Sequence, residues 1–408
     1  MRRVMNWTNT RTSFYIFYTL FWLIFLYAGL IVADFLIPKI TTISPEIQVI
    51  DDSYQKQSEK QKKELLKSHV KSINLAEIER HKEFIELIES KGVIGISSYP
   101  DRNLLYCNEG YGWQIYKSDS YGFRNFDDQY KSKVDVAIFG DSFIHGGCVP
   151  TEATISQVMN KYGNVMGFGL GGSDPIHYAS MLKVMIPRVK PKQAGIAFYN
   201  NDFNDSDETS IFYKYIIKGD SHENYFDDNG NLSSNIDEYF RSVLQISEKK
   251  AANSPKRGRG QKLSFSDLII KFQKYMLLNN IRAILYKYIP DFVPLSGLSQ
   301  SSKIAIDELM HQCDINKCSP FITYLPNSNY WNPNYVSSYY MAQLKEYAKN
   351  HGVRFIDLTD IIDSENLSHF SPRGGHYSIK GYKNVGEYLS HKLFLTKKRK
   401  FDVDQNNL

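Results

Sequence analysis

Short apolar runs alternate with longer helical stretches in the second part of this chain, and this alternation limits the architectures it can adopt. The runs read VDVAIF, NVMGF, AGIAFY, SPFITYL and VRFIDL, and they begin at residues 134, 164, 194, 319 and 353. Apolar runs of this length, bounded by turn residues, are typical of buried strands. Strands that alternate with helices indicate a mostly parallel sheet covered on both faces. We therefore predict an α/β fold, a three-layer α/β/α sandwich, over residues 97–396.

A longer apolar stretch lies near the N-terminus. Residues 14–33 contain no charged side chain over 20 positions, which is about the length that a helix needs to cross a bilayer core. We predict a transmembrane anchor over residues 13–36. A cleaved signal peptide is the alternative, because Ile31-Val32-Ala33 loosely resembles a cleavage site, although the stretch is long for a signal peptide.

The charges beside this stretch predict its orientation. Basic residues precede it, whereas one lysine closely follows it. These residues are Arg2, Arg3, Arg11 and Lys39. The positive-inside rule places residues 1–12 in the cytoplasm and everything after residue 40 outside. We expect a single-pass protein of the bacterial inner (cytoplasmic) membrane with an extracytoplasmic domain.

The four cysteines agree with a compartment in which disulfides form. Cys313 and Cys318 are spaced to close a small loop, and Cys107 would then meet Cys148. The sequence does not settle this connectivity. Free buried thiols are an equal alternative, and a zinc site, with only His311 nearby, is a weaker one.

The remaining segments differ in composition. Residues 37–96 are polar with an irregular helical stripe, and we predict a helical stalk or linker rather than a dimerising coil. Residues 205–300 interrupt the sheet pattern, and we expect this insertion to form a lid or cap beside the active site. Residues 397–408 form a basic tail.

Partners and cofactors are limited by what the sequence contains. The formal net charge is +5, and the basic runs have no aromatic or recognition motif beside them, so we do not expect nucleic-acid binding. We expect no cofactor and no metal, because the sequence has neither a phosphate-cradling motif nor a convincing zinc spacing.

Four separated segments offer residues suited to acyl chemistry. Ser142 ends a strand and begins a helix, where its backbone N–H can face a developing oxyanion. Gly172 lies in a glycine-dense strand end that permits close backbone approach. Asn201 ends the next strand with an amide donor, and His376 precedes a late helix. Each segment alone is weak evidence for catalysis. For example, a turn with Ser142 as the helix N-cap would explain Gly-Asp-Ser equally well.

As a set, these residues resemble the GDSL/SGNH hydrolase family in order and spacing. Ser142 matches the nucleophile block, Gly172 and Asn201 match two further blocks, and His376 matches the block of the general base. Residues 121–125, YGFRN, also resemble a lead-in of bacterial membrane-anchored members. The resemblance implies an SGNH/flavodoxin-like sandwich in which the N–H groups of Ser142 and Gly172 and the amide of Asn201 hold the oxyanion.

The resemblance leaves the partner of His376 open. Family members usually place an Asp two or three residues before the histidine, where this chain has Gly374 and Arg373. Either a backbone carbonyl orients the imidazole, or an acid comes from the end of VRFIDLTDIID, or the site no longer turns over. Asp141 is expected to brace the turn, as it does in the family. The candidate acids are Asp357, Asp360 and Asp363.

The expected activity is that of a membrane-anchored, extracytoplasmic serine esterase or deacetylase that removes O-acyl groups, with envelope polysaccharide or small esters as substrates. An O-acyltransferase for exported glycans is an alternative, suggested by the anchor and the large insertion. A non-catalytic binding or assembly protein is another, suggested by the missing acid.

Overall fold

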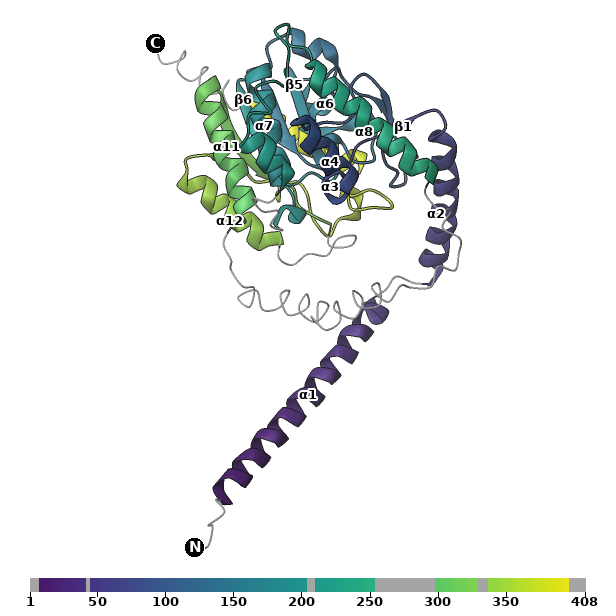
Figure 1. The fold of residues 1–408 in the computed structure, drawn as a ribbon, viewed down its shortest axis with the longest axis vertical. Coiled ribbons are helices and arrows are strands. Elements are labelled where there is room, and N and C mark those ends of the chain that lie inside the picture. The colour runs from purple at the N-terminus through teal and green to yellow at the C-terminus, as the bar shows by residue number, and fades with distance from the viewer. Residues whose placement is uncertain (1–6, 42–44, 204–209, 254–297, 329–336, 396–408) are drawn as a thin grey trace. The chain divides into compact units, whose positions relative to one another are not determined.

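The computed structural model describes residues 7–41, 45–203, 210–253, 298–328 and 337–395. The chain divides into two compact units (Figure 1). The described part of the first unit holds helix α1 (Trp7–Thr41) and the beginning of helix α2 (Pro45–Leu65). The second unit begins at Tyr54 and holds every strand of the described residues.

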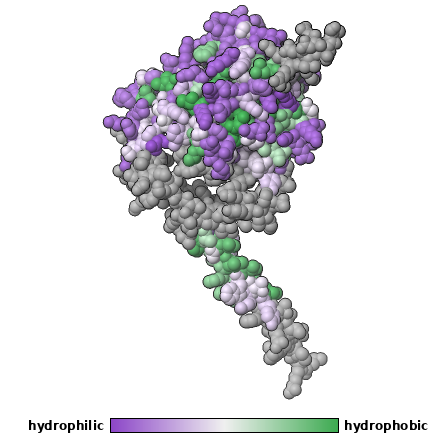
Figure 2. All heavy atoms as spheres, turned by 180° about the vertical axis from the view of Figure 1, so that it is seen from behind, coloured by the Kyte–Doolittle hydropathy of each residue, from purple (hydrophilic) through white to green (hydrophobic). Residues whose placement is uncertain are grey.

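Helix α1 is apolar over most of its length. Its segment Tyr15–Asp34 has a mean hydropathy of 2.2, and no residue of the apolar window within it is buried. Figure 2 shows hydrophobic side chains on the described part of α1, whereas hydrophilic side chains dominate the visible face of the second unit. The helix is therefore long and apolar enough to cross a membrane, a property that signal sequences share.

The second unit is built on a five-stranded, all-parallel sheet with the order β5-β4-β6-β7-β8. Every residue of β4, β5 and β6 is buried, as expected for strands covered on both faces. The predicted α/β class with a parallel sheet is thus confirmed. The strands are β4 (Val136–Gly140), β5 (Val165–Gly169), β6 (Gln193–Phe198), β7 (Ser319–Tyr324) and β8 (Arg354–Ile356).

Alternate residues of β4 belong to two different cores, one on each face of the sheet. Ala137 and Phe139 lie in the larger cluster, and Val136 and Ile138 lie in the smaller one, because successive side chains of a strand point to opposite faces. Helices α7 and α11 pack against each other over the first face (Figure 1). The helices of the first face are α7 (Pro175–Val189), α11 (Gln300–Asn316) and α12 (Ser337–Asn350), and those of the second are α6 (Ile155–Met159) and α13 (Ile379–Ser390).

The segment expected to be a stalk contributes to the second unit from Tyr54 onward. Leu75, Ile78 and Ile88 are buried in the same cluster as the sheet. The irregular apolar stripe of this segment is therefore core-facing, which differs from a freestanding linker over residues 37–96. Its elements are β1 (Val70–Lys71), α3 (Leu75–Arg80) and α4 (Lys82–Lys91), and β1 joins β2 (Asn103–Leu105) and β3 (Ile115–Lys117) in a small sheet.

The expected insertion is described over residues 210–253. Its helix α8 (Ser234–Asn253) packs against α4. The Lys91 Nζ–Glu238 Oε1 distance there is 2.7 Å. Residues 254–297 of the insertion and the basic tail lie outside the described residues, so the lid remains a prediction.

Candidate active site

Ser142 begins a short helix directly after β4. Asp141 is the N-cap of this helix, α5 (Ser142–His145), and its carboxylate accepts a hydrogen bond of 2.9 Å from the backbone N–H of Phe143. Gly140 is required just before it, because a Cβ there would lie 2.6 Å from Ile144 Cγ1 and 3.0 Å from a backbone oxygen of β6. The strand end and the cap thus present the Ser142 hydroxyl at the carboxyl edge of the sheet, and Asp141 hydrogen-bonds within the turn.

His376 reaches the same edge from the loop before α13. Its Nε2 lies 2.8 Å from Ser142 Oγ. The imidazole packs near the ring of Phe143, with 4.9 Å between ring centroids, and a Cβ on Gly147 would lie 2.4 Å from its Cδ2 atom. The backbone of Gly147 therefore fits closely against the imidazole and limits its movement.

A third residue, Glu109, completes the arrangement. It lies in the turn between β2 and β3, and its Oε1 is 2.7 Å from His376 Nδ1. Its second oxygen accepts a hydrogen bond of 3.2 Å from the backbone N–H of His376. A Cβ on Gly374 would lie 1.9 Å from the Glu109 carboxyl carbon. The family pattern favours an Asp near this position. Because Gly374 has no side chain, the Glu109 carboxylate can occupy the space that a side chain there would fill.

The expected source of the acid is corrected by this geometry. Asp357 accepts a hydrogen bond of 3.0 Å from the backbone N–H of Thr359 and forms an ion pair with Lys345. Asp363 accepts one of 3.0 Å from the backbone N–H of Glu365. Asp360 is exposed. These carboxylates have partners or solvent of their own after β8, and the structure instead brings the acid from the segment that precedes the nucleophile.

One sequence signal pointed toward Glu109. Cys107, two residues before it, forms a disulfide with Cys148, which lies in the loop after α5. A disulfide between Cys107 and Cys148 places residue 109 near Ser142, because Cys148 follows Ser142 by six residues. Cys313 forms the second disulfide with Cys318.

The electrostatics suit a histidine that accepts a proton from Ser142. Burial lowers the pKa of His376, but the hydrogen bond and the negative charge of Glu109, together with the charge of Asp141, outweigh burial and raise the pKa above its usual value. Because Nδ1–H is donated to Glu109, Nε2 keeps its lone pair for the Ser142 proton. Burial also raises the pKa of Asp141 to about 6, against the opposing effect of the Phe143 N–H.

Two of the expected oxyanion residues, Gly172 and Asn201, lie just after the two strands that flank β4. Gly172 follows β5, is exposed and has a φ of +74°; a Cβ there would lie 2.1 Å from Asn74 Oδ1. Asn201 follows β6, is exposed, and its side chain hydrogen-bonds to Asp141. Parallel pairing of β4 with both neighbours therefore brings the segments of Ser142, Gly172 and Asn201 to one edge of the sheet, where His376 contacts Ser142.

Glu109, Cys148 and His376 also offer atoms that could hold a metal, within 4.8 Å of one another. Cys148 is bonded to Cys107, and a disulfide sulfur lacks the thiolate charge that makes cysteine a metal ligand. Glu109 and His376 hydrogen-bond each other. The donor set therefore fits an acid–base pair better than a metal centre.

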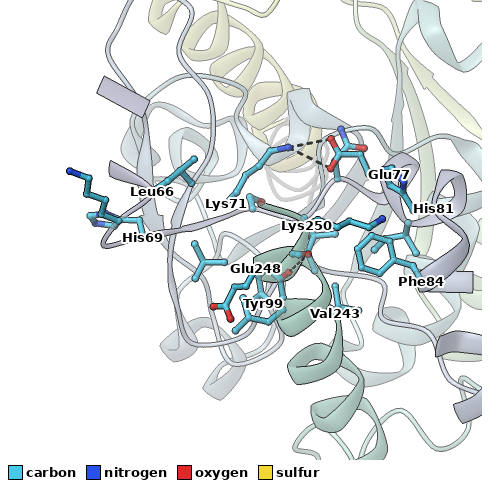
Figure 3. A pocket seen from close by; sticks show the side chains of 18 of the residues that line it. Leu66, His69, Lys71, Glu77, His81, Phe84, Tyr99, Val243, Glu248 and Lys250 are labelled. Carbon is cyan, nitrogen blue, oxygen red and sulfur yellow. Dashed lines mark hydrogen bonds and ion pairs between the residues drawn. The ribbon is translucent and has the colours of Figure 1, made fainter. Parts of the chain in front are cut away.

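A cavity of about 690 Å³ lies in the second unit, lined by residues of β1, α3 and α8 (Figure 3). Apolar side chains such as Phe84 and Val243 line it together with charged ones such as Lys71. Its lining includes neither Ser142 nor His376. The Ser142–His376 pair therefore does not form part of this cavity.

Comparisons with known proteins give matches among solved structures. No family model matches the chain, and no curated protein matches it. One matching structure is of a protein assigned to the lipolytic G-D-S-L family from Desulfitobacterium hafniense DCB-2, with 16% identity over 63% of this chain and 98% of that chain and a TM-score of 0.33. A GDSL-like lipase from Bacteroides thetaiotaomicron VPI-5482 matches with 12% identity over 64% and 89% of the two chains and a TM-score of 0.30. A member of the same lipolytic family from Veillonella parvula DSM 2008 matches with 14% identity over 62% and 95% and a TM-score of 0.30. At such values, the functional assignment must come from the geometry of Ser142, His376 and Glu109.

Proposed function

We propose that this chain is a serine esterase or deacetylase that removes O-acyl groups by way of a Ser142–His376–Glu109 triad. One observation carries the proposal. A continuous line of hydrogen bonds, 2.8 Å from Ser142 Oγ to His376 Nε2 and 2.7 Å from His376 Nδ1 to Glu109 Oε1, ends at a half-buried serine at the carboxyl edge of a parallel sheet. A nucleophile, a base and a group that orients the base are the parts that acyl transfer requires.

The reaction would proceed in two halves. His376 Nε2 takes the proton of Ser142 as Oγ attacks the ester carbonyl carbon, and the resulting imidazolium gives this proton to the departing alcohol. The acyl group is then attached to Ser142. Water enters, loses a proton to His376, attacks the acyl carbon and releases the carboxylic acid, and His376 returns the proton to Ser142 Oγ.

Negative charge on the carbonyl oxygen needs donors during both halves. The backbone N–H groups of Ser142 and Gly172 and the amide of Asn201 are our candidates, since they come from adjacent strand ends. A preorganised donor of this kind contributes about 3–4 kcal/mol to transition-state stabilisation. Glu109 would act by holding the imidazole and by stabilising its protonated form.

The location and the substrate class also belong to the proposal. The apolar helix α1 and the two disulfides support an extracytoplasmic domain anchored by its N-terminus, because disulfides persist outside the cytoplasm. Acylated envelope polysaccharide or small esters would then be the accessible substrates.

The test is hydrolysis of p-nitrophenyl acetate by the purified full-length protein. Ser142→Ala should abolish turnover, because no other group replaces the attacking oxygen, while Ser90→Ala, at an exposed serine, should leave it unchanged. Full activity in Ser142→Ala would eliminate the proposal. Added sugar acceptors would reveal an acyltransferase if acylated sugar forms faster than free acid.

The non-catalytic alternative was motivated by the missing acid, and Glu109 now occupies that position. A fluorophosphonate probe tests the alternative directly. Labelling of Ser142 that is lost in His376→Ala would show an activated serine, whereas absence of labelling in the wild-type protein would favour a binding role.

A further inference from the structure

The disulfide between Cys107 and Cys148 joins the two segments that carry the acid and the nucleophile. Their Cα atoms are 4.9 Å apart. Cys107 stands two residues before Glu109, and Cys148 lies in the loop that follows α5. Cys148 Sγ is 3.9 Å from His376 Nδ1, the same nitrogen that contacts Glu109. The bond therefore lies directly beside the acid–base contact.

The nucleophile side of this bond is firmly held. The buried guanidinium of Arg124 donates to the backbone oxygens of Gly146 and Val149, each at 3.0 Å. These two residues flank the Gly147-Cys148 pair, and Cys148 has a φ of +59°, a conformation that is uncommon for a residue with a side chain. The loop of residues 146–149 is thus held in place, and the disulfide attaches the segment of Glu109 to it.

The acid side is a partly exposed turn. Glu109 lies between β2 and β3, and Gly110 next to it is exposed. The neighbouring Asn108 accepts a hydrogen bond from Tyr54 and donates one to Ser58, both of helix α2. The backbone oxygen of Glu109 accepts a bond of 3.1 Å from Arg373. Hydrogen bonds of half-exposed groups contribute little each, whereas the disulfide is a covalent restraint.

We propose that the Cys107–Cys148 disulfide is a positioning element for catalysis, which holds the Glu109 carboxylate against His376 Nδ1. Both cysteines act through Glu109 and not on the substrate. A displacement of the carboxylate by about 1 Å is enough to lower a rate by about 10²-fold. This inference rests on the proposed function and adds to it a dependence on the oxidised state of one particular disulfide.

The second disulfide provides a matched control. Cys313 and Cys318 are 5 residues apart and close the junction between α11 and β7, whereas 41 residues separate Cys107 and Cys148. Full-length Cys107→Ser/Cys148→Ser should lose about 10²-fold in kcat/KM for p-nitrophenyl acetate, and Cys313→Ser/Cys318→Ser should keep wild-type kinetics. Equal kinetics in the two double variants would overturn the proposal.

Combination with Glu109→Gln separates positioning from general destabilisation. If the disulfide acts through the Glu109 carboxylate, its removal should add no more than about 2-fold to the loss already caused by Glu109→Gln, since coupled residues are not additive. Losses that multiply would show an independent structural role and would overturn the proposal.

Chemical reduction provides a measurement that does not require the variant Cys107→Ser/Cys148→Ser to fold. In Cys313→Ser/Cys318→Ser, the remaining disulfide is Cys107–Cys148. Tris(carboxyethyl)phosphine, which is oxidised as the disulfide becomes two thiols, should lower kcat/KM in step with thiol appearance, and reoxidation should restore it. Activity that survives complete reduction would contradict the proposal.

An NMR titration of the His376 imidazole distinguishes failure of this inference from failure of the proposed function. The signal is assigned by its absence in His376→Gln. Removal of the Cys107–Cys148 bond should lower the pKa of His376, because the Glu109 charge that raises it moves away, whether or not the protein hydrolyses esters. An unchanged pKa would contradict positioning, and a lowered pKa in a protein without esterase activity would retain positioning and reject the function.

Discussion

Glu109 and Gly374 show how one residue can take over the place of another. A side chain at position 374 would collide with the Glu109 carboxylate, which instead contacts both the ring and the backbone of His376. The carboxylate beside the imidazole therefore comes from a turn that is 267 residues away in sequence, and in the proposed mechanism it is the acid that orients His376. The bond to Nδ1 fixes the tautomer of the imidazole, and the bond from the backbone N–H holds the carboxylate in place beside it.

Glu109→Gln should lower kcat/KM by up to about 10⁴-fold, the magnitude seen when the orienting carboxylate of a serine triad is neutralised. The pH profile should move as well. Glu109 raises the pKa of His376, and the base is active when neutral, so the rate rises as pH passes upward through that pKa. Loss of the charge lowers the pKa and should shift this acidic limb to lower pH. Stopped-flow or steady-state rates from about pH 5 to pH 9 measure both effects.

Asp360→Asn is the matched control for this change, since Asp360 is an exposed carboxylate. Its kinetics should equal those of the wild type. A Glu109→Gln protein with unaltered kcat/KM and pH profile would show that Glu109 does not orient the base.

Asn201→Ala should lower kcat for p-nitrophenyl acetate by about 10²–10³-fold with little change in KM, because an oxyanion donor acts mainly in the transition state. Asn229→Ala, at an exposed asparagine, should leave both constants unchanged. A rise in KM alone would assign Asn201 to substrate binding instead.

At the scale of elements, the YGFRN segment (residues 121–125) hydrogen-bonds both to the edge strand β5 and to the loop after α5. Asn125 Nδ2 donates to the backbone oxygen of Gly167 at 3.0 Å, and the Gly167 N–H donates to Asn125 Oδ1 at 2.9 Å. Arg124 meanwhile donates to the loop after α5. Asn125 thus pairs with the outer edge of β5. Its neighbour Arg124 supports the loop that follows Ser142.

Asn125→Ala should reduce the free energy of unfolding by about 2–3 kcal/mol, because it leaves a buried N–H and a buried C=O of β5 without their side-chain partner. Thermal unfolding followed by intrinsic fluorescence measures the change. Asn229→Ala again provides a surface control. An unchanged melting temperature in Asn125→Ala would mean that water satisfies the edge of β5 equally well.

At the scale of the whole molecule, helix α1 is long and apolar enough to cross a membrane, and this predicts where the chain resides. If α1 is an uncleaved anchor, the cellular protein should retain its N-terminus and sediment with membranes, because about 20 apolar residues are enough to span a bilayer. Deletion of residues 1–41 should move it to the soluble fraction. N-terminal sequencing that begins just after Ala33 would instead identify a cleaved signal peptide.

Local patterns in the sequence were enough to predict the parallel sheet, since the strand runs carry their own apolar signature. The resemblance of four separated segments to the GDSL/SGNH family predicted Ser142 and His376 as a pair, and the structure places the two side chains in hydrogen-bond contact. The first prediction depends on features within a few residues of each strand, and the second depends on the order and spacing of the four segments along the chain.

Glu109, the disulfide pairing and the packing of residues 70–91 were decided by the tertiary structure. A glutamate beside a glycine has no local signature, and its role depends on a contact between segments distant in sequence. The sequence by itself thus determined which elements form and where strand ends present reactive side chains, because hydrophobic periodicity is a local property. Only the folded chain decided which carboxylate meets the histidine, because that contact depends on how separate loops pack at one edge of the sheet.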